Sequence, residues 1–296
     1  MLGIANYSMK GPKQAAIAVV LSSALSVILA PIGLITGGLI ALVTLRISSI
    51  EGFKSLALAV VAQLAVTMMI TGNALPAFIA IMEFLLPVWV LSVVLRETQS
   101  FAKTLQAALI FIAIGLALFH LSVSDTAAYW LALYNETIAP VLAEAKVEYD
   151  LELITQLANM VTMLIAVFAL VLWFSIVLIG RWWQSQLYAP GQFRKDFYEL
   201  RVSSQTAYAG IAISIASLAL GQTNGLIYDL TGLFIAVFMF QGLAIAHATV
   251  DQKQASVGWL VGIYILLFIF PQTMLILATL GLIDTWMDFR RRWDSE

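Results

Sequence analysis

Six polar side chains interrupt apolar stretches of this chain, and hydrogen bonding to a small polar solute is the chemistry that they could perform. The six are Glu83, Asn159, Asn224, Asp229, Gln241 and Gln272. If these stretches span a membrane, an ionisable group among them is a candidate functional residue, because a charge at mid-bilayer costs about 2.5–3.5 kcal/mol on insertion scales. Amide side chains at such positions either bond across helices or contact a solute. The alternative for all six is structural pairing that only fixes helix packing.

The residues around each candidate indicate which of these roles it could have. Glu83 is the one carboxylate well inside an apolar run, and the flanking Pro76 and Pro87 indicate local opening of a helix. Asn224 and Asp229 belong to the break that begins at 221–225, which either lines a cavity, as non-helical backbone at membrane depth must, or is an interfacial loop. His120 stands beside Ser122, Ser124 and Asp125, which predicts local hydrogen bonds.

The elements that position these residues are predicted to be transmembrane helices. Hydrophobic residues make up 61% of the chain and charged residues 11%, against roughly 25% charged residues in a soluble domain. Stretches such as 105–121 and 257–282 contain no Asp, Glu, Lys or Arg and are too long for barrel strands. We therefore predict an all-α, polytopic helical membrane protein with about 8–9 transmembrane helices in one bundle, forming a single integral membrane domain over residues 1–296.

The apolar runs define the expected helices. They lie at 15–30, 32–46, 54–72, 75–95, 103–124, 153–180, 206–221, 226–249 and 257–283. The first two are shorter than the roughly 17–25 residues of a spanning helix, and Pro31 and Gly33 separate them. We expect a hairpin of two short helices over 14–46, with a single kinked span as the alternative.

Basic residues predict the orientation, since Lys and Arg accumulate on the cytoplasmic side of short loops. A cytoplasmic amino terminus places the basic-aromatic loop 181–205 in the cytoplasm and the acidic, amphipathic loop 125–152 outside. Arg290, Arg291 and Arg292 would lie outside after three more full crossings. We expect them to be cytoplasmic, with eight crossings and one partial segment: either 206–221 is re-entrant or the last run folds back at Pro271. The remaining alternative is that the charge rule fails at this end.

Composition and motifs argue against several functional classes. The chain has no cysteine and two histidines, which argues against thiolate and histidine-rich metal sites, and its net charge of −2 argues against nucleic-acid binding. The sequence contains no H-E-x-x-H, G-x-S-x-G or G-x-x-x-x-G-K-[ST] motif. We predict no catalytic residue, no metal, no cofactor and no ATPase activity of its own.

Small residues on the first long helix suggest a second kind of contact. Ala18, Ser22, Ser26 and Ala30 recur every four residues and form one ridge of that helix. Small side chains let another helix approach closely in lipid. The ridge predicts either docking of another membrane subunit or packing within the same chain.

Several short motifs, in order, resemble the YybS-like family of bacterial integral membrane proteins. They are Pro31-Ile32-Gly33 with Leu45-Arg46, Pro190-Gly191-Gln192-Phe193, Phe240-Gln241-Gly242-Leu243-Ala244, and Gly281-Leu282-Ile283-Asp284-Thr285-Trp286 with Asp288-Phe289-Arg290. That family has no established biochemical activity and is considered distantly similar to the S components of energy-coupling-factor transporters. The resemblance implies a small-solute binder of the bacterial inner membrane that docks on a transmembrane coupling subunit.

The leading hypothesis is therefore an inner-membrane, solute-binding or transport-related protein without its own ATPase. Its partners would be the lipid bilayer, an unidentified small solute and, on the first helix, a second membrane subunit. The alternative is a non-transporting membrane scaffold or assembly factor for a cell-envelope complex. An intramembrane enzyme is a more distant alternative.

Overall fold

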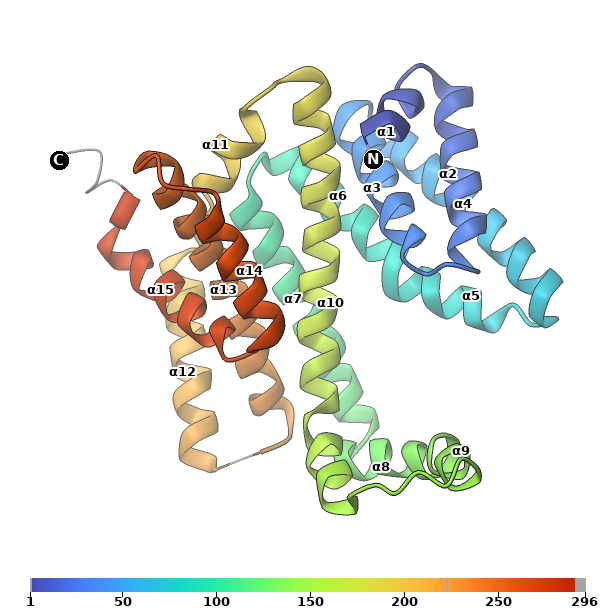
Figure 1. Ribbon diagram of the computed structural model, residues 1–296, viewed down its shortest axis with the longest axis vertical. Helices are drawn as coiled ribbons and strands as arrows, with labels where there is room; N and C mark the ends of the chain where they lie inside the picture. The colour runs from blue at the N-terminus through green and yellow to red at the C-terminus, as the bar shows by residue number, and fades with distance from the viewer. Residues whose placement is uncertain (1, 222, 291–296) are drawn as a thin grey trace. The chain divides into compact units, whose positions relative to one another are not determined.

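The computed structural model describes residues 2–221 and 223–290, and within these ranges it contains helices and short connectors but no strand (Figure 1). Arg291 and Arg292 lie outside the described residues. The helices are α1 (Leu2–Ser8), α2 (Pro12–Ser26), α3 (Ile32–Arg46), α4 (Ser49–Thr71), α5 (Leu75–Ala80), the π-helical turn η1 (Ile81–Leu85), α6 (Leu86–Thr98), α7 (Phe101–Ser122), α8 (Thr126–Thr137), α9 (Ala139–Glu144), α10 (Leu151–Tyr188), α11 (Gln192–Tyr198), α12 (Ser204–Leu220), α13 (Leu226–Gln252), α14 (Gly258–Ile269) and α15 (Thr273–Met287).

The predicted class, a polytopic helical membrane protein, is confirmed. Five helical segments of the described chain are long and apolar enough to cross a bilayer: α4, the continuous Leu75–Thr98, α7, α10 and α13. The helices α3, α12, α14 and α15 are apolar but shorter. The chain divides into two compact units, Met1–Ala108 with Val171–Leu200, and Leu109–Leu170 with Arg201–Glu296. The single domain predicted from sequence stays a prediction.

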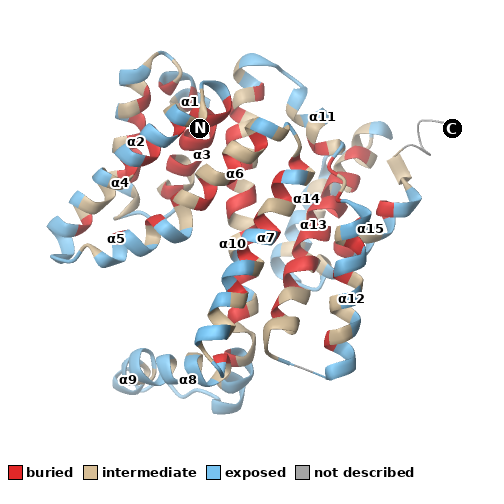
Figure 2. Ribbon diagram, turned by 180° about the vertical axis from the view of Figure 1, so that it is seen from behind, coloured by how far each residue is buried: buried red, intermediate tan, exposed pale blue. Residues whose placement is uncertain are grey.

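In the first unit, α3 is the buried central helix (Figure 2). It pairs with α2 across the turn at Val27–Pro31, where Thr36 Oγ1 donates to Ser22 Oγ at 3.0 Å. Glycines on α3 and α10 allow close approach of the two helices, since a side chain at Gly38 would meet Trp183 and one at Gly180 would meet Ala41.

One of the two prolines, Pro87, produces the expected local opening, whereas Pro76 lies in the first turn of α5. Pro87 has no N–H, so the carbonyl of Glu83, four residues earlier, loses its helical partner. The backbone forms the π-turn η1 at this place, and Trp173 Nε1 donates to Glu83 O at 2.8 Å. A side chain from a distant part of the sequence thus replaces the hydrogen bond that Pro87 cannot make.

In the second unit, α13 is buried along most of its length and α15 packs closely against it. The expected final run at 257–283 is two helices, because the chain reverses at Phe270–Gln272 around Pro271. Helix α14 has 12 residues, about 18 Å at 1.5 Å per residue, so it reaches only part of the way across a bilayer.

This reversal determines on which side of the unit the described chain ends. Helix α12 leads away from Arg201, α13 returns, and α14 with α15 forms a hairpin (Figure 1). Arg201 Nη1 lies 2.7 Å from Asp288 Oδ2, immediately after α15, so both ends of this arrangement lie on the same side. Of the two alternatives for a partial segment, the structure contains the fold-back at Pro271.

The two polar connectors are more helical than the apolar runs indicated. Helix α10 continues to Tyr188, and α11 occupies part of the expected loop 181–205. The acidic 125–152 segment contains α8 and α9, whose residues are mostly exposed (Figure 2). Apolar runs therefore mark where these helices are lipid-compatible, but they do not mark where the helices end.

Glycine at 242 should be essential for the packing of α13 against α15. The Cβ of an alanine at this position would overlap the backbone of Leu277, which a side-chain rotation cannot relieve. We expect Gly242→Ala to lower the free energy of unfolding by about 1–3 kcal/mol, the usual cost of overpacking, measured by denaturation in detergent. Gly262→Ala on α14 is the matched control, because nothing lies within 4 Å of its Cβ. Equal stability of the two variants would contradict the close backbone contact between α13 and α15.

Candidate functional site

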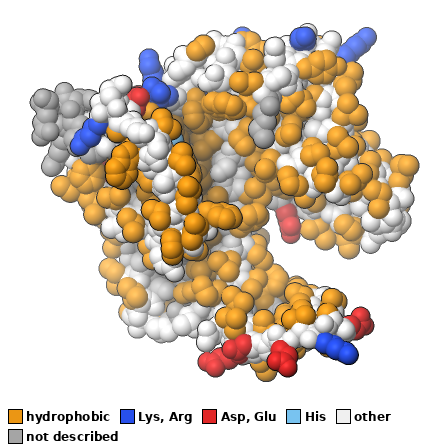
Figure 3. All heavy atoms as spheres, in the orientation of Figure 1, with side chains coloured by type: hydrophobic (Ala, Val, Ile, Leu, Met, Phe, Trp, Pro, Cys, Tyr) orange, Lys and Arg blue, Asp and Glu red, His pale blue; other side chains and the backbone are white. Residues whose placement is uncertain are grey.

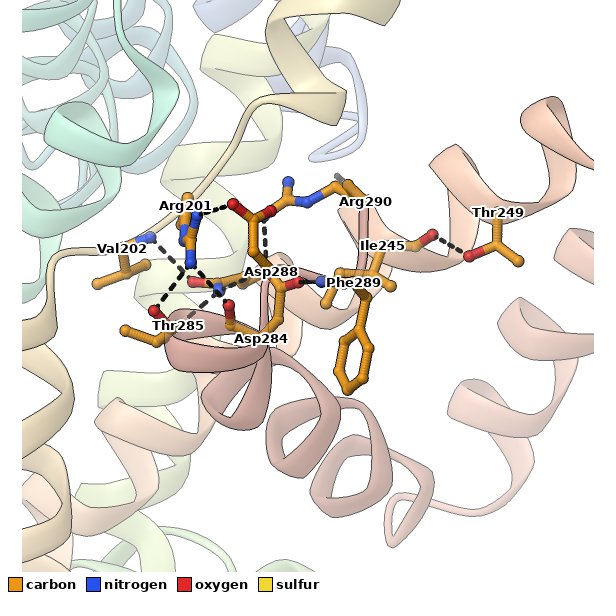
Figure 4. Close-up of polar contacts among 10 residues, drawn as sticks. Arg201, Val202, Ile245, Thr249, Asp284, Thr285, Asp288, Phe289 and Arg290 are labelled. Atoms are coloured by element: carbon orange, nitrogen blue, oxygen red, sulfur yellow. Dashed lines mark hydrogen bonds and ion pairs between the residues drawn. The ribbon is translucent and has the colours of Figure 1, made fainter. Parts of the chain in front are cut away.

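A network of buried and half-buried polar side chains in the second unit joins α13 to the end of α15. We call it the α13–α15 polar cluster; its members are Arg201, Gln241, Asp284, Asp288 and Arg290, and all but Gln241 are labelled in Figure 4. Gln241 and Asp284 are each 0% exposed. Buried groups of this kind are stable only when their hydrogen bonds are satisfied.

Asp284 is the centre of the cluster. Its Oδ2 accepts from Gln241 Nε2 at 3.2 Å and from Arg290 Nη2 at 2.5 Å, and its Oδ1 accepts from the Phe289 backbone N–H at 3.0 Å. Gln241 Oε1 in turn accepts from the Val202 backbone N–H at 2.9 Å. The Asp284 carboxylate thus neutralises the charge of the Arg290 guanidinium, and it also accepts a backbone N–H just beyond the carboxyl end of α15.

Arg201 completes the cluster from the connector that precedes α12. Its guanidinium bonds Asp288 and also donates to the carbonyls of Asp284 and Thr285, at 3.1 and 2.9 Å. Carbonyls in the last turn of a helix have no helical partner and carry partial negative charge, so a cation there is stabilising. Arg201 therefore fixes the end of α15 beside the start of α12.

An apolar groove lies next to this cluster, between α13, α14 and α15. It has a volume of about 420 Å³, within the range of small-molecule sites. Its walls are mainly apolar: Ile245, Ala246 and Val250 from α13, Trp259 and Ile263 from α14, and Leu280 from α15. Thr249 and Lys253, at the carboxyl end of α13, supply its polar groups.

The groove and the polar cluster share their supporting elements. Gly242 and Phe289 line the groove, and each is directly connected to the cluster. Gly242 follows Gln241 in sequence, and the backbone N–H of Phe289 donates to Asp284. Loss of the cluster would therefore displace two groove walls. A second hollow of about 440 Å³ shares Trp259 and Ile263 with the groove and is also lined by Gly262 and Leu266 of α14, which has no buried residue and is therefore loosely packed.

Three of the six predicted polar candidates form pairs away from the groove. Asn224 Nδ2 donates to Asn159 Oδ1 at 3.1 Å. Asp229 Oδ2 lies 2.7 Å from His120 Nε2. The sequence predicted local partners for His120, and this prediction is wrong: its partner is 109 residues away, because the end of α7 lies against the first turn of α13.

Glu83 and Gln272 belong neither to these pairs nor to the cluster that contains Gln241. Glu83 has an exposed side chain on the π-turn, and its role in the hydrogen-bond network is through its backbone carbonyl. Gln272 is exposed at the turn between α14 and α15, without a side-chain cap hydrogen bond. The structure therefore does not bring all six candidates into one site.

The small-residue ridge is used largely inside the first unit. Ala18 and Ser22 are each 4% exposed, and Ser22 accepts the hydrogen bond from Thr36 of α3. Ser26 is half-buried and Ala30 lies exposed in the turn after α2. Packing within the chain thus accounts for the first half of the ridge, and docking of another subunit stays a prediction.

Sequence reasoning missed Arg201, Asp284 and the groove. The sequence shows Arg201 only as a basic residue of a loop, and Asp284 only as part of a terminal motif. A usable signal was the position of Asp284 directly at the end of the apolar run 257–283, since a carboxylate there needs a partner. No comparable signal marks a groove, which depends on how three helices meet.

Comparison with known proteins gives one match. A family model described as "Predicted membrane protein (DUF2232)" matches residues 16–285. The matched region extends from α2 into α15 and includes Gln241 and Asp284. No curated protein and no solved structure matches the chain.

Replacing the central carboxylate should destabilise the second unit. Asp284→Leu would remove the carboxylate that accepts from both Arg290 and the Gln241 amide. We expect a loss of about 3–5 kcal/mol in unfolding free energy, because breaking one partner of a buried ion pair is strongly destabilising. The control is Glu51→Gln, whose pair with Lys54 is largely exposed and should contribute about 0–1 kcal/mol. Denaturant titration in detergent measures both; an Asp284→Leu protein as stable as Glu51→Gln would show that the cluster is not structural.

Proposed function

We propose that this chain, which belongs to the DUF2232 family of predicted membrane proteins, binds a small amphipathic solute in the apolar groove of α13, α14 and α15. The groove volume of about 420 Å³ is the observation that carries the proposal. Its apolar walls suit an apolar chain or ring, because burying such a surface is favourable. Thr249 and Lys253 suit a polar or anionic end of the same molecule.

The position of the groove within the hairpin supports a role in membrane transport. Discontinuous helices that reverse inside the membrane form the solute sites of many transporters. We propose the role of a solute-binding subunit, similar to the S components of energy-coupling-factor transporters, as the resemblance to the YybS-like family implies. In this role the chain has neither an ATPase nor an enzymatic activity of its own, and a coupling subunit or a gradient supplies the energy.

The proposed setting is the bacterial inner membrane, with a cytoplasmic amino terminus. The basic residues of the connectors support this orientation through the positive-inside rule. For a coupling subunit, α2 offers an exposed apolar face with Ile17, Leu21 and Leu25. This face is more accessible than the ridge of Ala18 and Ser22, which packs against the same chain.

A membrane scaffold remains the second candidate, and one observation favours it. Asn159 and Asn224 bond each other, and Gln241 bonds Asp284 and the Val202 N–H, so these amides already have partners in the chain. Polar groups used in this way fix helix packing and need no solute. The two functions differ in whether the groove takes up a molecule.

Filling the groove should abolish solute binding. Ala246 lines the groove and is half-buried, so the larger side chain of Ala246→Phe would occupy its volume. The probe is a photoactivatable palmitate, cross-linked to the purified protein and mapped by peptide mass spectrometry. We expect cross-links on peptides of α13–α15 in the unchanged protein and a several-fold loss in Ala246→Phe.

Ala212→Phe is the matched control, because Ala212 is exposed on α12 and does not line the groove. It should label like the unchanged protein. Lys253→Gln tests whether the polar end of the groove binds an anion. If this variant is labelled less by the photoactivatable palmitate, but not less by the corresponding uncharged fatty alcohol, the solute has an anionic end group. Labelling spread evenly over exposed helices and unaffected by Ala246→Phe would overturn solute binding and leave the scaffold.

A further inference from the structure

The His120–Asp229 pair is a buried acid–base pair that the groove does not use. The Asp229 side chain is 1% exposed and the His120 side chain 14% exposed. Asp229 Oδ2 lies 2.7 Å from His120 Nε2, while Asp229 Oδ1 is buried with no hydrogen-bond donor among the described residues. A buried carboxylate with only one donor is costly in its charged form, because nothing compensates the second oxygen.

The helices around Asp229 in the second unit offer few other charges. On α10, the side chains near this part of α13 include Met163 and Val167, which lie beside Gly232, and Asn159, which bonds Asn224. Helix α12 contains no Asp, Glu, Lys, Arg or His along its length. Helix α7 supplies His120, and α13 itself supplies the neighbouring Tyr228.

The helix α8 lies close to the histidine side of the pair. Phe119, next to His120, contacts the rings of Tyr129 and Trp130 at 5.7 and 6.0 Å between centroids. The carboxylates of this segment, Asp125 and Glu136, are exposed, and its other titratable side chains are Tyr129 and Tyr134. His120 is thus the titratable group in direct contact with the Asp229 carboxylate.

The acidic 125–152 segment gives this end of the unit a negative field. It carries one basic side chain, Lys146, and six acidic ones: Asp125, Glu136, Glu144, Glu148, Asp150 and Glu152. These acids gather over α8, α9 and the connector that follows (Figure 3). A surface of one sign raises the local concentration of oppositely charged ions, including protons.

We propose that the His120–Asp229 pair is a proton-binding site of the membrane-embedded unit, which holds one proton at Asp229 Oδ1. Without this proton, the His120 N–H donates to Oδ2 and the pair carries one negative charge. Uptake of one proton forms the O–H bond at Oδ1 and makes the pair neutral; release returns the proton to water. The partly exposed imidazole lies between the buried carboxylate and the surface, so it is the route of exchange.

A protonatable acid–histidine pair in a membrane helix is the kind of group that couples solute movement to a proton gradient. The site is independent of the groove, since none of its residues lines the groove. The inference therefore goes beyond the proposed function and does not depend on it. It provides a source of energy for a chain without a nucleotide-binding motif.

Infrared difference spectroscopy tests this directly, because a protonated carboxylic acid has a carbonyl band that a carboxylate lacks. Spectra of the purified protein are recorded during a pH titration over the range in which carboxyl and imidazole groups change charge. We expect a carbonyl band that appears as the pH falls, shifts on ¹³C-aspartate labelling and exchanges slowly in heavy water, since Asp229 is buried. The band should be absent in Asp229→Asn.

Asp125→Asn is the matched control, because Asp125 is an exposed carboxylate at the same end of the unit, where it caps α8. It should keep the slowly exchanging band. His120→Gln should keep the carbonyl band but shift its frequency, because a different group then donates to Asp229 Oδ2. This result would test the assignment even if Asp229→Asn did not fold. A slowly exchanging band missing at every pH, or a change confined to imidazolium bands, would overturn the assignment of the proton to Asp229 Oδ1.

Discussion

Hydrocarbon supplies no hydrogen bonds, and this constraint explains the unusual features of the fold. At several places where a backbone group lacks its regular helical partner, a side chain from elsewhere in the sequence provides one. Trp173 donates to the Glu83 carbonyl that Pro87 leaves free, and Arg96 donates to Thr44 and Leu45 at the end of α3. The α13–α15 polar cluster does the same for the end of α15. These contacts join residues that are far apart in sequence, so they also fix which helices pack together.

Close backbone packing and buried charge support each other in the second unit. Gly242 and Gly281 let α13 and α15 approach until their backbones are in contact, which leaves no space for water around Asp284. The dry environment strengthens the pairing with Arg290, and the pairing in turn prevents the helices from separating. Helix α14 has no buried residue, and its side chains line both hollows. The α14–α15 hairpin thus combines a tightly packed helix, α15, with a loosely packed one, α14.

Much of the architecture could be predicted from sequence, because the hydropathy of a segment indicates whether it lies in lipid or in water. Composition indicated the class, Pro31 and Gly33 marked the break between α2 and α3, and Pro271 marked one of two possible places of reversal. Partners could not be predicted, because periodicity places a residue on a face but does not say which helix covers it. His120 with Asp229 and Arg201 with Asp288 are examples, at separations of 109 and 87 residues. Helix ends were also missed, since α10 continues through polar residues to Tyr188.

The last two helices, α14 with 12 residues and α15 with 15, are shorter than a spanning helix, and from this we infer that their hairpin enters the membrane and returns without crossing it. The chain has no cysteine, so single cysteines can be introduced and labelled in intact vesicles with a membrane-impermeant reagent. We predict that Gln205→Cys, Gln252→Cys and Met287→Cys react from one side and Thr223→Cys from the other. Gln272→Cys, at the hairpin tip, should react from neither side. Labelling of positions 252 and 287 from opposite sides would contradict the account.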